Sequence, residues 1–151
     1  SIAPFEAFKT KDSYIIIAAG NDKLFGKLCE VLKIPETTND ERFNSNSLRC
    51  ENMNQLKEIF EKQLSSKSTN EWIREMEALK IPCGPIFNIK QAVENPQIKE
   101  RNMIVKSYHK IIGEFKSAGN PIKMSTYKDE TTRGNIPDLD EHREKIIKEF
   151  T

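Results

Sequence analysis

The first 32 residues change from a strand pattern to a helical pattern, and this order restricts the possible folds more than any other part of the sequence. Residues 5–10 and 13–19 are rich in aromatic and β-branched side chains and are separated by a polar pair, which predicts a β-hairpin. The second segment contains three consecutive isoleucines at 15–17. A continuous apolar run is typical of a strand that is central in its sheet or covered on both faces. We therefore expect this strand to lie inside a small sheet.

A helix is expected directly after the hairpin. Asn21 is the expected N-cap, because its side-chain oxygen can accept a hydrogen bond from the first helical turn, and Asp22 is favourable at the positive end of the helix dipole. Apolar side chains then recur at helical spacing, beginning with Leu24 and Leu28, and Pro35 lies beyond the end of the pattern. These residues predict an amphipathic helix packed on the sheet.

Two further amphipathic helices are expected in the next part of the chain. Residues 37–52 are polar and resemble a surface loop with a short helical turn, in which Phe43 is the expected anchor. Apolar side chains resume the helical period over residues 53–64. Ser68 and Glu71 then have the spacing of a capping box, which predicts the start of the next helix.

Residues 81–86 are the most constrained stretch of the chain. Pro82 and Pro85 fix φ at two positions and remove two N–H donors, so we expect a rigid connector here. Asn88 and Gln91 again have capping-box spacing, which predicts a short helix after the connector.

The following segments predict a second sheet element and then a linker. Residues 103–109 and 111–117 alternate around a turn and indicate a second antiparallel hairpin. Another extended piece is expected at 122–125. Residues 126–136 are charged and polar without an apolar period, which favours a flexible linker.

The last predicted element is a helix within residues 137–151. Asp138 and Glu141 have the spacing to cap it, and Ile146 and Phe150 belong to its apolar face. The preceding pattern offers this helix no partner. The fold class that we predict is therefore α+β: a small antiparallel β-sheet of roughly four strands covered by several helices, plus a detached C-terminal helix.

Charge and composition argue against several kinds of partner. The 24 Lys and Arg residues almost balance the 23 Asp and Glu residues, so no overall field recruits nucleic acid or an anionic membrane. The apolar stretches are too short to cross a bilayer. The odd number of cysteines, three, indicates free thiols in a reducing compartment, and we predict a cytoplasmic location.

The histidines and cysteines form no recognisable catalytic or metal-binding pattern. Their spacings place no nucleophile beside a base and no two ligands at helical distance. We therefore predict no catalytic, cofactor-binding or metal-binding residue in this chain. The residues concerned are His109, His142, Cys29, Cys50 and Cys83.

Four segments, taken in order, resemble the small domain of the class III CoA-transferases, the family of formyl-CoA transferase, carnitine CoA-transferase and α-methylacyl-CoA racemase. They are FEAFKTKDSYIIIAAGNDKLFGKLCEVL at 5–32, WIREMEALKIPCGPIFNIKQAVENPQI at 72–98, GNPIKMS at 119–125 and PDLDEH at 137–142. The most specific motif is IPCGP, framed by the Trp-containing helix and by ENPQI. One departure is Asp140, because members of the family often have a glycine before the Glu-His pair.

The resemblance implies a two-domain enzyme that forms an interlocked homodimer. A Rossmann-like large domain would bind CoA, and its catalytic aspartate would form an acyl anhydride and then a thioester with CoA. It also implies that residues 1–125 are the small domain, 126–136 a linker, and 137–151 a helix that packs on the large domain. Because the chain starts without methionine and lacks the catalytic positions, we expect an inactive fragment whose parent uses a CoA thioester as substrate.

The one candidate site is the turn formed by Gly20, Asn21 and Asp22. Its free backbone N–H groups could face a substrate carboxylate at the lip of the acyl pocket, although an ordinary helix cap explains the same residues. By resemblance, this turn is more similar to the acid CoA-transferases than to the racemases, which tend to carry an acidic-proline pair here. A 2-methylacyl-CoA racemase remains an alternative, as does a non-catalytic module whose last helix docks a protein partner.

Overall fold

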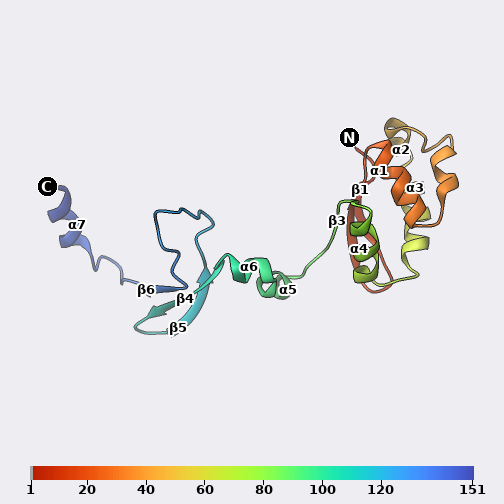
Figure 1. Cartoon of the computed structure of the whole chain (residues 1–151). Helices are drawn as coiled ribbons and strands as arrows, with labels where there is room; N and C mark the ends of the chain where they lie inside the picture. Colours follow the sequence, from red (N-terminus) through yellow and green to blue (C-terminus); the bar gives the residue numbers. More distant parts are fainter. Residues whose placement is uncertain (1) are drawn as a thin grey trace. The chain divides into compact units, whose positions relative to one another are not determined.

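The computed structural model describes residues 2–151 and divides into two compact units, residues 1–86 and residues 87–151 (Figure 1). Within the described residues, α-helices are combined with two three-stranded sheets, one in each unit. The predicted α+β class is confirmed. The strands are divided between two small sheets, whereas the sequence predicted a single sheet.

The first unit contains a three-stranded antiparallel sheet in the order β1-β2-β3. Strands β1 (Phe5–Lys9) and β2 (Tyr14–Ala18) form the predicted hairpin, and β2 is central, as predicted. The predicted rigid connector is in fact a strand, β3 (Cys83–Pro85), with Gly84 opposite Ile16. The two prolines are tolerated because β3 lies at the edge of the sheet and pairs only with β2. A proline at an edge can turn the side that lacks an N–H donor away from the neighbouring strand.

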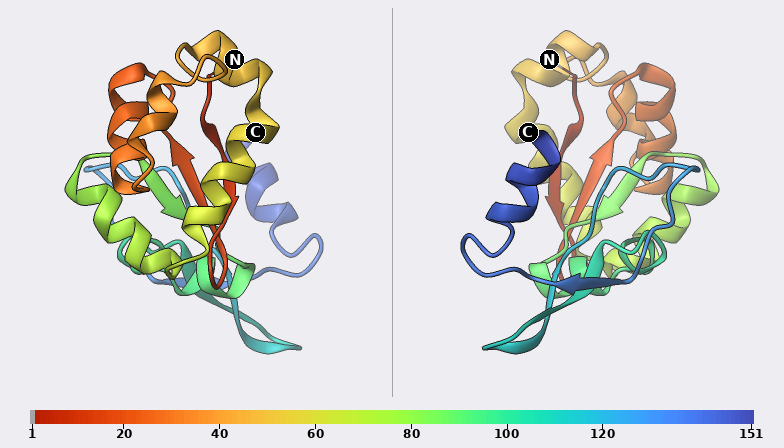
Figure 2. Two further views of the ribbon diagram at one scale, coloured as in Figure 1. Left: turned by 90° about the vertical axis from the view of Figure 1, so that its right-hand side faces the viewer. Right: turned by 90° about the vertical axis from the view of Figure 1, so that its left-hand side faces the viewer.

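The side chains of β2 alternate between a covered face and an open face. Ile15 and Ile17 are fully buried, whereas Ile16 is 41% exposed. Figure 2 shows the helices of this unit on one face of its sheet. Of the two alternatives that the isoleucine run predicted, the central position therefore holds, and the apolar side chain of Ile16 belongs to the open face.

Helices surround the covered face and close the core of the first unit. The phenyl ring of Phe60 lies between those of Phe8 and Phe25, with centroids 5.7 and 6.3 Å away. All three rings are buried, and such pairs add packing energy beyond the area that they remove from water. The helical segments are α1 (Asp22–Val31), the 3-10 helix η1 (Pro35–Asn39), α2 (Asn46–Glu51), α3 (Met53–Leu64) and α4 (Thr69–Ala78).

Local signals set the ends of these helices. The capping box of Ser68 and Glu71 is present at the start of α4, as predicted. The indole Nε1 of Trp72 donates a 2.8 Å hydrogen bond to the carbonyl oxygen of Leu64, which joins α4 to the end of α3. Phe43 is fully buried, which confirms its role as the anchor of the preceding loop.

The second unit is built around a sheet in the order β5-β4-β6. Strands β4 (Ile104–His109) and β5 (Gly113–Ala118) form the second predicted hairpin. Gly113 has φ +77° in its turn, a conformation that favours glycine. Two short helices, α5 (Ile89–Glu94) and α6 (Pro96–Glu100), precede the hairpin, and α5 begins with the predicted capping box.

Strand β6 (Thr132–Asn135) lies within the segment that the sequence predicts as a linker. It pairs in parallel with β4, and the carbonyl oxygen of Thr131 accepts a hydrogen bond from the Lys106 backbone N–H. Residues 122–125, predicted as extended, form no strand. The spacing of apolar side chains did not predict β6, because an exposed edge strand is held by backbone hydrogen bonds rather than by an apolar face.

The last helix, α7 (Arg143–Phe150), begins later than predicted. Glu141 does accept a 2.7 Å hydrogen bond from the Asp138 N–H, but this contact closes a turn ahead of the helix. Asp140 has φ +70°, a conformation that favours glycine. Among the described residues, no helix is long and apolar enough to span a membrane.

Candidate functional site

The turn between β2 and α1 has the geometry of a helix N-terminus. Asn21 has φ −86° and ψ 155°, and its Oδ1 accepts a 2.8 Å hydrogen bond from the Leu24 N–H, so the predicted N-cap is confirmed. Gly20 precedes it without a side chain, and a Cβ built there would overlap Cγ2 of Ile2. The turn therefore depends on glycine for the close approach of the N-terminal segment.

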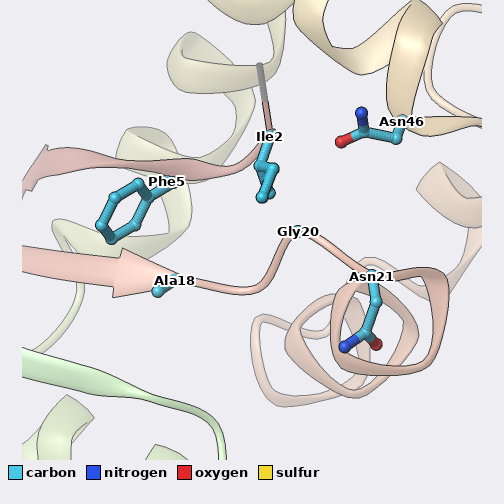
Figure 3. Close-up of a pocket in the computed structure, with 6 residues that line it drawn as sticks. All are labelled: Ile2, Phe5, Ala18, Gly20, Asn21 and Asn46. Atoms are coloured by element: carbon cyan, nitrogen blue, oxygen red, sulfur yellow. The ribbon is translucent and has the colours of Figure 1, made fainter.

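A pocket of about 430 Å³ opens at this turn. Figure 3 shows the side chain of Ile2 above Gly20, with the carboxamide of Asn46 at the start of α2 beside it. Apolar side chains and two carboxamides line the pocket, and no ionisable side chain is among the lining residues that the structure describes. The lining residues are Ile2, Phe5, Ala18, Gly20, Asn21 and Asn46.

Two of the three predicted site residues line this pocket. Gly20 and Asn21 contribute to its wall, whereas Asp22 does not. The carboxylate of Asp22 instead lies 2.8 Å from a guanidinium nitrogen of Arg49. The side chain of Asp22 is 78% exposed while that of Arg49 is 1% exposed, so the pair joins a buried cation to a hydrated anion.

Arg49 is the residue at this site that the sequence did not reveal. Its Nε donates to the carbonyl oxygen of Ala3 at 2.9 Å, and its Nη1 donates to that of Phe43 at 3.1 Å. Its Nη2 donates to the carbonyl oxygen of Gly20 at 3.1 Å as well as to Asp22. An arginine in a polar segment ordinarily indicates a solvated surface, and no local pattern could have shown that its partners come from three separate segments.

The segment that carries Ile2 is also held from both sides. The Ala3 N–H donates a 3.0 Å hydrogen bond to Oδ1 of Asn46, while the Ala3 carbonyl accepts from Arg49. The carbonyl oxygen of Pro4 accepts a hydrogen bond from the Ala19 N–H at 2.9 Å. Helix α2 and the end of β2 therefore fix the backbone on both walls of the pocket.

The thiols of the first unit have no catalytic setting in the structure. Burial raises the pKa of the Cys29 thiol to about 12 and also raises the pKa of Cys83. A thiol with a raised pKa stays protonated near neutral pH and is a poor nucleophile.

In the second unit, His109 Nδ1 accepts a hydrogen bond from the Ile111 N–H, and His142 occupies the N-cap position of α7 without a side-chain cap bond. Among residues 2–151, no group of three or more His, Cys, Asp and Glu side chains is arranged to hold a metal ion.

The sequence belongs to CoA-transferase family III, whose profile matches residues 1–143. It is 38% identical over 149 residues to the acetyl-CoA:oxalate CoA-transferase of Acetobacter aceti and 32% identical over 149 residues to the human succinyl-CoA:glutarate CoA-transferase. Both alignments cover 99% of this chain. The resemblance inferred from the sequence motifs is thereby confirmed at the level of the family.

Solved structures give the same family. A CAIB/BAIF family protein from Brucella suis matches with a TM-score of 0.76 and 31% identity, and the match covers 99% of this chain and 38% of that one. A variant of the Mycobacterium tuberculosis protein Rv3272 matches with a TM-score of 0.83 and 26% identity, over 95% of this chain and 39% of that one. The chain also spans only 37% of the Acetobacter aceti enzyme and 34% of the human enzyme.

Proposed function

We propose that this chain is the small domain of a CoA-transferase that moves CoA from a thioester to a small carboxylic acid. The observation that carries the proposal is the family match over residues 1–143, combined with a pocket at the turn where the sequence predicted one. Gly20, Asn21 and Asp22 would form part of the acyl pocket. In support, Gly20 and Asn21 line the pocket of about 430 Å³, and Asp22 is paired with Arg49 beside it.

The chemical step is assigned to residues outside this chain. A carboxylate nucleophile would attack the acyl-CoA to form an acyl anhydride and release the CoA thiolate, which would then attack the enzyme-side carbonyl, form an enzyme–CoA thioester and release the first acid. The acceptor carboxylate would displace the thiolate to form a second anhydride, and attack of the thiolate on the acceptor acyl group would give the new CoA thioester and free the enzyme carboxylate. Among residues 2–151, the pocket is lined by no ionisable side chain that could act in this way. This chain aligns with only 37% and 34% of the length of two relatives. The remaining length is ample for a large domain that would supply an aspartate and bind CoA.

The residues of this chain would bind and orient the acyl group. The first N–H groups of α1 have no partner inside the helix and attract a carboxylate or a polarised carbonyl oxygen. Ile2 and Phe5 would keep water from the reactive thioester or anhydride. Dicarboxylic acids are suitable first candidates for the acceptor, since the two relatives are named for oxalate and glutarate.

We also propose that residues 1–125 act as the small domain and 126–136 as a linker, and that residues 137–151 pack on the large domain. The exposed apolar side chains of Ile146, Ile147 and Phe150 on α7 support this assignment, because they would otherwise remain in water. An interlocked homodimer and a cytoplasmic location complete the proposal.

The test is a CoA-exchange assay on the complete polypeptide that the gene encodes. Acetyl-CoA and succinyl-CoA serve as donors, oxalate and glutarate as acceptors, and the thioesters are separated by chromatography. We expect a new thioester that forms only when the matching acid is present. The isolated 151-residue chain, assayed in parallel, should form none. Absence of exchange with every pair would refute the proposed function.

A further inference from the structure

Arg49 connects the walls of the pocket although it does not line it. The pocket has one wall from the N-terminal segment, which carries Ile2 and Phe5, and another from the turn at Gly20 and Asn21. The guanidinium of Arg49 donates to a backbone carbonyl in each of these walls, at 2.9 Å in the first and 3.1 Å in the second. One side chain therefore ties the two walls together beyond the point where the backbone hydrogen bond between Ala19 and Pro4 joins them.

The guanidinium itself has little freedom to move. It is 1% exposed, and its Cζ lies 4.4 Å from the centroid of the Phe25 ring. A planar fork with several fixed donors holds its partners in one geometry, whereas the ammonium of lysine is a single point charge on a flexible stem. Four acceptors on three segments fix the direction of the Arg49 fork, and the ring of Phe25 supports one face.

The core of the first unit does not need the Arg49 side chain to be closed. The core of this unit is already closed by apolar side chains, including Phe8 and Phe60. An arginine buried only for stability is costly, because its charge must be removed from water. Its bonds to Ala3 and Gly20 are instead directed to the backbone next to and within the pocket lining.

We propose that Arg49 is a positioning residue for the acid substrate, because it holds the segment of Ile2 and the turn of Gly20 at the separation that the bound acid requires. This inference rests on the proposed function of the pocket and extends it to a residue that no substrate touches. Loosening the fork should weaken binding of the acid more than it slows the chemical step, since the reacting groups lie outside this chain.

The test measures steady-state kinetics of the complete polypeptide. The donor is acetyl-CoA or succinyl-CoA and the acceptor is oxalate or glutarate, in the pair that the unaltered protein turns over fastest. For Arg49→Lys, which keeps the charge and loses the fork, we expect the KM for the acid to rise about tenfold while kcat changes by less than about threefold. Phe25→Leu removes the supporting ring and leaves all pocket-lining side chains in place. It should raise the same KM by about threefold.

Two control variants separate positioning from stability. Trp72→Phe removes a buried hydrogen bond to Leu64, and neither residue lines the pocket, so it should lower the melting temperature without changing the KM for the acid. Arg42→Gln removes a half-exposed arginine outside the pocket lining and should leave the kinetics unchanged.

The outcomes distinguish failure of this inference from failure of the proposed function. An unaltered polypeptide that exchanges no CoA with any pair overturns both. If it is active, an unchanged KM in Arg49→Lys overturns the positioning role alone. If Arg49→Lys does not fold, Phe25→Leu decides: an unchanged KM, or an equal rise in Trp72→Phe, overturns the inference.

Discussion

Replacement of Arg49 by methionine should destabilise the first unit, and the size of the loss can be worked out from its contacts. The substitution keeps an unbranched side chain but leaves the carbonyl groups of Ala3, Phe43 and Gly20 without their donor. Hydrogen bonds to a charged donor contribute about 1.5 kcal/mol or more each, so the three sum to roughly 4–5 kcal/mol. Relief from burying the guanidinium offsets part of this, and Asp22 returns to water at little cost because it is largely exposed.

We therefore expect Arg49→Met to lower the free energy of unfolding by about 3 kcal/mol, a large share of the 5–15 kcal/mol typical of a domain. The assay is urea unfolding at pH 7, followed by the fluorescence of Trp72, the only tryptophan of the chain, which is 3% exposed. Arg42→Met is the matched control, because Arg42 is 48% exposed and its solvent-screened ion pair with Asp40 should contribute little to stability. Equal losses in the two variants would refute the role given to the buried hydrogen bonds.

Three further predictions concern the core, a thiol and an acidic turn. Phe60→Ala should cost about 3–5 kcal/mol in urea unfolding, because the ring is fully buried against two others; a loss below 1 kcal/mol would contradict the packing. Iodoacetamide at pH 8 should label Cys50 before Cys29 in the folded chain, since Cys29 is buried with a pKa near 12, and peptide mass spectrometry would show the order. Hydrogen bonds from Arg42 lower the pKa of Asp40 from 3.8 to about 2, so its stabilising effect is complete above pH 3.8 and is lost as the pH falls toward 2. Asp40→Asn should flatten this part of the acid unfolding curve, and an unchanged curve would argue against the Asp40 contribution.

Features that depend on neighbouring residues could be predicted from the sequence. The N-cap at Asn21 and the capping box of Ser68 and Glu71 form because the side chain and the backbone N–H that it binds lie three residues apart. The two hairpins follow from alternation around short turns in the same way. Gly20 and Asn21 of the candidate turn line a pocket, and their role toward an acyl group stays a prediction.

Features that depend on distant pairing could not be predicted in this way. Strand β3 forms because Gly84 pairs with Ile16, which is far away in the sequence. The prolines at 82 and 85 had instead indicated a rigid connector. Arg49 was missed for the same reason, since its acceptors at Ala3 and Gly20 lie 46 and 29 residues away. A buried cation satisfied by backbone carbonyls leaves no trace in hydrophobic period or charge pattern.

The location of the covalent intermediate is the most direct test of the division of labour proposed for this protein. The complete polypeptide would be incubated with the acyl-CoA that it uses, and any activated carboxylate trapped by hydroxylamine as a hydroxamate. Peptide mass spectrometry would then identify the modified residue. We expect an aspartate outside these 151 residues. A hydroxamate on any of the 23 Asp and Glu residues of this chain would contradict the assignment of the chemistry to a second domain.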